Sequence, residues 1–100
     1  MPGNKPQPFP ALREFLRGYF HQDLADEYGS PEGATKQFLR DADAEQRAAV
    51  KHEWSMLLRQ TSHQSLDHMN EALRKLGSVW TFESLVELHK IGEILGKASD

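Results

Sequence analysis

Cysteine is absent from this chain of 100 residues. That absence excludes disulfide bonds, thiolate metal sites and a cysteine nucleophile, and it is typical of a reducing compartment. Long apolar runs are also absent, because none approaches the roughly 20 residues that a helix needs to cross a bilayer. The first residues lack the apolar core of a secretory signal. We therefore expect a soluble, cytoplasmic protein without a membrane partner.

The chain also lacks an excess of basic residues. The 15 acidic and 12 basic side chains give a net charge of −3, whereas a general nucleic-acid binder carries surplus lysine and arginine. We therefore expect no direct contact with nucleic acid. The charge is uneven along the chain: residues 23–45 hold seven acids against two bases, residues 1–22 have a net charge of +2, and residues 46–100 are neutral.

Signals for β-strands are scarce as well, since no segment alternates apolar with polar residues and valine and isoleucine are few beside leucine. Helical spacing is present instead. The first apolar stripe, at three- and four-residue intervals, consists of Leu12, Phe15, Leu16, Tyr19 and Phe20. The same spacing predicts helices over residues 10–21, 31–40, 44–61, 64–76 and 82–95, with a short helical turn over 24–28.

The expected fold class is therefore all-α. We expect a compact single-domain bundle of about five helices over residues 10–96, because short connections between amphipathic helices favour one shared core. Four of the five prolines lie within residues 1–10, so we expect residues 1–9 to form an extended, flexible lead-in. Residues 97–100 are expected to form a frayed tail.

Capping residues mark where these helices begin and end. Ser30 precedes a proline at the first helical position, and Asp43 begins a capping-box pattern. Thr81 is expected to cap the last helix, and Gly77 to end the one before it. Gly18 inside the first helix costs about 1 kcal/mol against alanine, which suggests a close-packed neighbour.

Two histidine clusters are candidates for metal or acid–base chemistry. His63, Asp67 and Glu71 recur at one-turn intervals, a spacing that zinc hydrolases use. His21 and Asp23 follow the first helix as an acid–base pair would. A solvated helix face explains the first cluster better, and a structural hydrogen bond at a turn explains the second. We expect no catalytic residue, metal or cofactor, with a small helical enzyme as the alternative hypothesis.

The acidic stretch is the strongest functional signal in the residues themselves. Glu32, Asp43 and Glu45 have local reasons to be acidic, because they lie at helix starts. The remaining acids have none, and a cluster of this kind favours a surface for a basic partner. The candidate surface comprises Asp23, Asp26, Glu27, Tyr28, Glu32, Asp41, Asp43 and Glu45.

One run of residues resembles a known family. The segment from Phe15 to Asp23 (FLRGYFHQD), followed by Tyr28–Glu32 and the helix that carries Ala34 and Phe38, resembles the immunity proteins of bacterial contact-dependent growth inhibition systems. The shared run itself looks architectural, since its aromatic residues lie on the apolar stripe.

The resemblance implies a small, non-enzymatic cytoplasmic protein. Such a protein binds the C-terminal toxin domain of a large exported effector and protects the producing cell. It implies a one-to-one heterodimer with the cognate toxin. Many of these toxins are nucleases, often acting on transfer RNA, so an acidic inhibitor surface facing a basic substrate groove is our hypothesis for this chain.

Overall fold

Six helices make up most of the chain in the computed structural model, which describes residues 9–61 and 64–97. They are α1 (Pro10–Tyr19), α2 (Leu24–Tyr28), α3 (Pro31–Asp41), α4 (Ala44–Gln60), α5 (Leu66–Leu76) and α6 (Leu85–Lys97). The predicted all-α fold class is confirmed. Most of the predicted lead-in and tail lies outside the described residues, as does His63.

Local capping chemistry explains where the middle helices begin and end. The Ser30 hydroxyl accepts the Gly33 N–H at 3.1 Å at the start of α3. Asp43 and Gln46 form the predicted capping box, in which each side chain accepts the other's backbone N–H. Gly77 ends α5 with a φ of 122°, a conformation that favours glycine. These three predictions are confirmed.

The start of α6 differs from the prediction. The helix begins later than residue 82, and Thr81 does not cap it. Asn70 of α5 explains the delay, because its amide donates to the Phe82 carbonyl at 2.9 Å and accepts the Phe82 N–H at 2.7 Å. The Phe82 carbonyl, which would accept the Val86 N–H in a helix beginning at residue 82, is bonded to Asn70 instead, whereas the N–H of a first helical residue has no intrahelical partner in any case. The Ser84 hydroxyl, 3.4 Å from the Glu87 nitrogen, takes the place of the expected cap.

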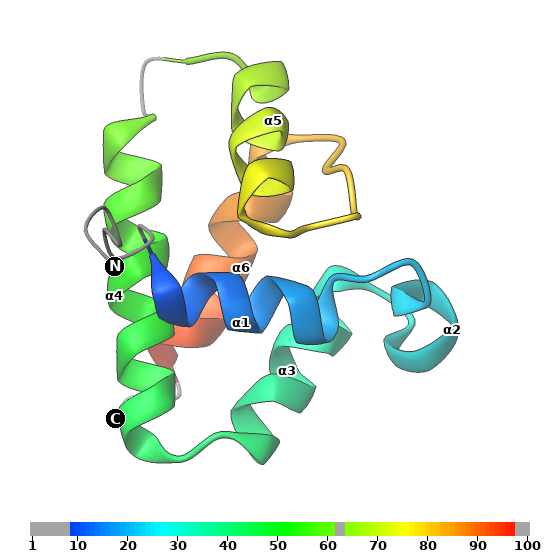
Figure 1. The fold of residues 1–100 in the computed structure, drawn as a ribbon, viewed down its shortest axis with the longest axis vertical. Coiled ribbons are helices and arrows are strands. Elements are labelled where there is room, and N and C mark those ends of the chain that lie inside the picture. The colour runs from blue at the N-terminus through cyan, green and yellow to red at the C-terminus, as the bar shows by residue number, and fades with distance from the viewer. Residues whose placement is uncertain (1–8, 62–63, 98–100) are drawn as a thin grey trace, which may run out of the picture.

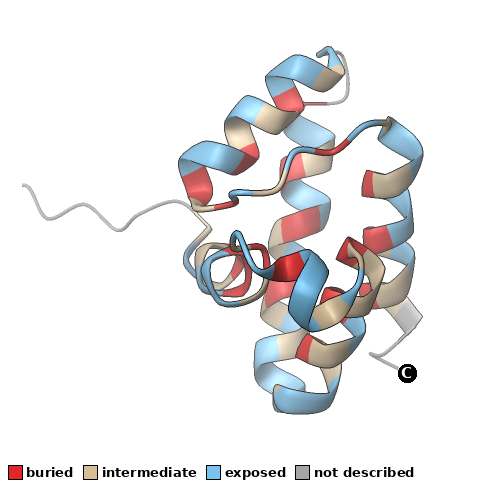
Figure 2. Ribbon diagram, turned by 90° about the vertical axis from the view of Figure 1, so that its right-hand side faces the viewer, coloured by how far each residue is buried: buried red, intermediate tan, exposed pale blue. Residues whose placement is uncertain are grey.

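The helices enclose a single core. Figure 1 shows α4 along one side of the molecule, with α1 running across it towards α2 at the opposite edge. α1 packs on α3, α4 and α5, while α6 packs on α3 and α4. Buried residues line the inward sides of the helices (Figure 2). The buried hydrophobic residues are Leu12, Phe15, Leu16, Phe20, Leu24, Ala34, Phe38, Val50, Trp54, Leu57, Met69, Leu73, Leu76, Phe82, Leu88, Ile91 and Leu95.

The packing prediction for Gly18 needs correction, and the first turn of α6 is more exposed than its apolar sequence suggests. A Cβ at Gly18 would meet nothing within 4 Å, so no described residue is the expected close-packed neighbour. α6 does carry core residues, but Leu85 and Val86 in its first turn are 46% and 64% exposed rather than enclosed. None of the helices in the described ranges combines the length and the apolar character that a bilayer crossing requires.

Candidate functional site

The fold divides the predicted acidic surface into two groups at opposite ends of α3. Asp23, Asp26 and Glu27 lie on or beside α2, which leads into the start of α3, and all three are exposed. Asp41 and the residues that follow it lie where α3 gives way to α4. An eleven-residue helix is about 16 Å long at 1.5 Å per residue, so the backbones of the two groups are about that far apart, although Tyr28 lies near enough to Asp41 for its charge to raise the Tyr28 pKa.

We call the first patch the α2 acidic group (Asp23, Asp26 and Glu27). The α2 helix packs mainly on α3 and lies at the edge of the molecule beyond the end of α1 (Figure 1). Tyr28, at the end of α2, is half-buried between this group and the core. A partner that approaches this edge therefore meets three carboxylates beside one phenol ring.

The predicted acids outside this group have structural partners or lie apart from it. Glu32 approaches Lys90 of α6 with a carboxylate–ammonium distance of 3.8 Å, so its charge is partly balanced. Asp43 caps α4 and remains exposed. Glu45 lies exposed in the first turn of the same helix. Asp41, Asp43 and Glu45 thus lie near one another in sequence where α3 gives way to α4, at the opposite end of α3 from the α2 acidic group.

Tyr19 connects the two patches. Its ring lies 5.6 Å from that of Tyr28, measured between centroids. Its hydroxyl donates to the Asp41 carboxylate at 2.7 Å, and the Gln37 amide donates to the other Asp41 oxygen at 2.9 Å. Sequence analysis assigned Tyr19 to the apolar stripe alone and missed this polar contact, because Asp41 lies 22 positions away.

These contacts shift the protonation equilibria of the three groups. Burial, followed by the hydrogen bond and charge of Asp41, raises the pKa of Tyr19 to about 12. Burial and the nearby Glu27 raise the pKa of Tyr28. The hydrogen bonds from Tyr19 and Gln37 lower the pKa of Asp41. At neutral pH this surface therefore presents protonated phenols and an ionised carboxylate.

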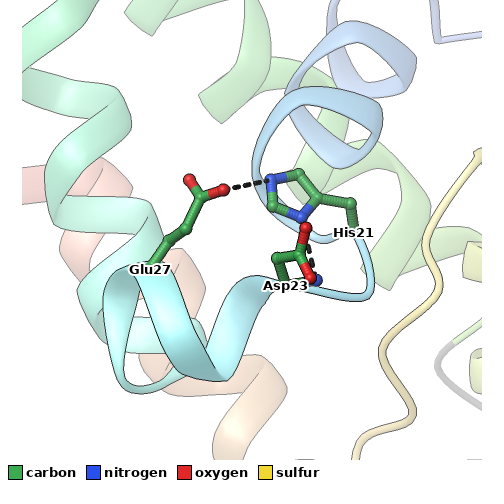
Figure 3. A group of neighbouring side chains, drawn as sticks. All are labelled: His21, Asp23 and Glu27. Carbon is green, nitrogen blue, oxygen red and sulfur yellow. Dashed lines mark hydrogen bonds and ion pairs between the residues drawn. The ribbon is translucent and has the colours of Figure 1, made fainter.

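His21, Asp23 and Glu27 lie close enough to be tested as a metal site. One ligand atom from each side chain lies within 4.8 Å of the others. Figure 3 shows the imidazole between the two acidic residues, with its Nε2 3.9 Å from a Glu27 oxygen. Its Nδ1 accepts the backbone N–H of Asp23 at 3.1 Å. The predicted structural hydrogen bond at this turn is therefore present.

That hydrogen bond opposes metal binding at the cluster. A neutral imidazole that accepts at Nδ1 carries its proton on Nε2, which is the nitrogen that faces Glu27. A metal ion would need a free lone pair on Nε2, which would place the proton on Nδ1, so binding would break the hydrogen bond from the Asp23 N–H. The second candidate cluster lacks a described histidine, and its Glu71 pairs with Lys75 at 3.8 Å on the exposed side of α5.

A groove between α1, α3 and α4 was not foreseen from the sequence. It has a volume of about 230 Å³. Its lining consists of Ala11, Glu14, Phe15, Tyr19, Phe38, Asp41, Ala42, Gln46 and Val50. Glu14 is the lining acid that sequence analysis passed over. The position of Glu14 beside the apolar stripe of α1 was the only sequence signal for its role. The packing of α3 against α1 was needed to show that Asp41 lines the same groove.

Comparison with known proteins places most of the chain in a family. The family model described as CdiI immunity protein matches residues 8–86, which include α1 to α5 and the first residues of α6. No curated protein matches the chain, and no solved structure matches it.

Proposed function

The chain belongs to the CdiI immunity protein family, and from this membership we propose that it binds and neutralises the C-terminal toxin domain of its cognate contact-dependent growth inhibition effector. The proposed complex contains one immunity protein and one toxin domain and forms in the cytoplasm. Inhibition by binding needs no catalytic residue, metal or cofactor in the immunity protein. We also propose that the acidic surface assigned from the sequence is the surface that binds the toxin.

A nuclease is the toxin class that the charge distribution favours. Nucleases that act on RNA hold a phosphate backbone in a basic groove. Residues 23–45 carry seven acids against two bases, so this part of the chain is the electrostatic complement of such a groove. A carboxylate surface would compete with RNA phosphates for the same lysine and arginine side chains. The proposed substrate of the toxin is transfer RNA or a related RNA.

The exposed α2 acidic group is the observation that carries this proposal. Its three residues are exposed, and α2 lies at the edge of the molecule (Figure 1). Charges placed in this way accelerate encounter with an oppositely charged partner, and salt screens the effect. We therefore expect α2 to guide association.

The test is a charge reversal. Asp23, Asp26 and Glu27 are changed together to lysine, and association with the toxin domain encoded in the adjacent reading frame is measured by stopped-flow fluorescence. We expect association at low salt to slow by about tenfold or more, because steering contributes on this scale. Protection of growing cells that express the toxin should weaken in parallel.

A matched variant controls for net charge. Reversal of Asp67, Glu71 and Glu93 changes the total charge equally but lies on α5 and α6. This control should associate as fast as the wild-type chain. Equal association rates for the wild-type chain, the α2 variant and the control variant would show that α2 does not guide association. Failure of the wild-type chain to protect cells would refute the proposed function itself.

The alternative enzyme hypothesis makes a separate expectation. A metal enzyme built on His21, Asp23 and Glu27 would take up one zinc ion per chain. The binding-protein proposal expects no stoichiometric uptake, because the Asp23 N–H already occupies Nδ1. Isothermal titration calorimetry with zinc distinguishes the two, and a one-to-one isotherm that His21→Gln abolishes would favour the enzyme.

A further inference from the structure

We propose that the groove between α1, α3 and α4 receives a single basic side chain of the toxin, preferably an arginine, which Glu14 and Asp41 bind at the rim. This inference rests on the proposed function and adds a second contact region to the α2 acidic group. It assigns to Glu14 and Tyr19 a part in binding that neither the sequence nor the family match gives them.

The lining of the groove has two chemically different parts. Aromatic and aliphatic side chains form its floor, contributed by Phe15 of α1, Phe38 of α3 and Val50 of α4. Carboxylates lie on its rim at Glu14 and Asp41. Among the described residues, no lysine, arginine or histidine lines it. The matching occupant has an apolar stem and a cationic head, as arginine and lysine do.

The size of the groove fits one side chain. Small-molecule sites enclose about 300–1,000 Å³, and this groove has a volume of about 230 Å³. An anchor side chain from a protein partner needs less space than a ligand, and arginine is enriched among such anchors. The groove is therefore a pocket within a larger protein interface.

The rim has acceptor capacity to spare. Asp41 receives one hydrogen bond on each oxygen, from Tyr19 and from Gln37, which leaves one lone pair on each oxygen for a partner. A guanidinium can use both oxygens at once, whereas an ammonium presents a point charge. The two existing bonds also hold the carboxylate in place. Glu14 is exposed, and no hydrogen bond or ion pair holds its side chain within the described residues.

The aromatic residues add a preference for a planar cation. The rings of Phe15 and Phe38 have centroids 4.8 Å apart, and the Tyr19 ring lies 5.6 Å from Phe38. Phe15 and Phe38 are almost fully buried, so a guanidinium that reaches Asp41 passes beside the half-buried Tyr19 ring, where stacking and cation–π attraction favour it over an ammonium. This is the reason for preferring arginine.

The experiment uses near-isosteric variants of the rim. Glu14→Gln and Asp41→Asn remove charge but keep an oxygen, so the amide oxygen at position 41 still accepts the Tyr19 hydroxyl, while Gln37 must turn its amide so that its oxygen accepts the new NH2. The affinity for a catalytically inactive toxin domain is measured by calorimetry at low and high salt. We expect the double variant to bind at least about tenfold more weakly, with a smaller dependence on salt. Asp67→Asn with Glu93→Gln, on α5 and α6, removes the same two charges; this matched control should bind as the wild-type chain does.

A third variant blocks the groove without changing charge. Ala11→Phe places a ring over the floor, and it should weaken binding to a similar extent while its circular dichroism melt shows a folded chain. Each arginine and lysine of the toxin is then replaced by alanine. For one of these toxin variants, the loss of affinity should be non-additive with the loss caused by Asp41→Asn, as expected for two residues in direct contact.

The outcomes separate this inference from the proposed function. Weaker binding by the rim and block variants, with an arginine partner in the double-mutant cycle, supports the groove. Coupling to a lysine supports the groove and corrects the preferred side chain. If all folded variants bind with wild-type affinity and neutralise the toxin normally, the groove does not bind a toxin side chain, while the proposed function still holds. Absence of wild-type binding overturns both.

Discussion

Tyr19 shows how one residue serves both packing and surface chemistry. Its ring packs against Phe15 and Phe38 with centroid distances of 6.0 Å and 5.6 Å. Its hydroxyl reaches the exposed Asp41 carboxylate. Aromatic residues with a polar tip suit such boundaries because the ring is buried while the hydroxyl finds a partner. The end of α1 is thereby tied to the end of α3.

The first prediction concerns the pH dependence of this tie. The folded pKa of Tyr19 is about 12, above the ordinary 10.0, so its contribution to stability is complete below pH 10 and is lost as pH rises through 12. The folded pKa of Asp41 is lowered from 3.8, so its contribution is present above that value and is lost as pH falls. Tyr19→Phe should reduce both dependences.

The measurement is the urea midpoint of wild-type and Tyr19→Phe proteins at acid, neutral and alkaline pH. The difference between them should be greatest near neutral pH and should shrink towards both extremes. A constant difference at every pH would mean that the hydroxyl contributes nothing through Asp41. Gln37 still donates to Asp41 in the variant, so part of the acid dependence should remain.

The second prediction concerns Gly18. This glycine lies in the last turn of α1 with open space around its missing Cβ and without a positive φ. Gly18→Ala should therefore raise the free energy of unfolding by about 0.5–1 kcal/mol, because alanine restricts the unfolded chain and favours the helix. Gly33→Ala is the opposing control, since its Cβ would clash with the Tyr28 carbonyl. Chemical denaturation that shows Gly18→Ala to be destabilising would contradict this.

At the scale of elements, two helix ends depend on side chains from other helices. Phe9 precedes α1 with a φ of 55° and gives it no side-chain cap. Glu53 of α4 supplies one instead, accepting the Leu12 N–H at 2.8 Å. Asn70 of α5 holds the segment that leads into α6 through both backbone groups of Phe82. These contacts set the angles at which the elements meet.

The third prediction tests the Asn70 contact. Asn70→Ala should lower the free energy of unfolding by about 2 kcal/mol, because it leaves a backbone N–H and a carbonyl of a buried residue without partners. Asn70→Asp keeps the acceptor for the Phe82 N–H and places a carboxylate against the Phe82 carbonyl, so it should be destabilising as well. Equal stability of Asn70→Ala and the wild-type protein in denaturant would show that water replaces both bonds.

At the scale of the whole molecule, α6 completes the core although the family match ends at its start. Leu88, Ile91 and Leu95 are almost fully buried against α3 and α4. The matched residues alone would leave these two helices with an open apolar face. The residues beyond the match are therefore structural in this chain.

The fourth prediction compares two residues of α6. Ile91→Ala should lower the free energy of unfolding by about 2–5 kcal/mol, as for other fully buried large-to-small changes. Val86→Ala should change it by about 0.5 kcal/mol or less, because the valine is 64% exposed. Thermal or urea unfolding of both variants measures the contrast. A loss at Ile91 as small as that expected at Val86 would mean that α6 is not part of the core.

Much of the helical layout could be predicted from local patterns. The caps Ser30 and Asp43 and the stop at Gly77 depend on residues within a few positions, so sequence alone located them. Thr81 misled the prediction because it looks like a cap locally, whereas Asn70, eleven positions earlier, binds the Phe82 carbonyl that a helix beginning there would use. Local helix propensity does not decide where a helix begins when a distant side chain binds the same backbone groups.

The acidic surface likewise depends partly on the sequence and partly on the tertiary structure. Its residues and their net charge were determined by the amino-acid sequence, and so was the family resemblance that the match confirms. Only the tertiary structure decided that α3 separates them into two patches, and that Glu14 joins Asp41 across a groove. The physical reason is that apolar periodicity determines which face of a helix is buried, while the partner of that face depends on how all the helices together fill one core.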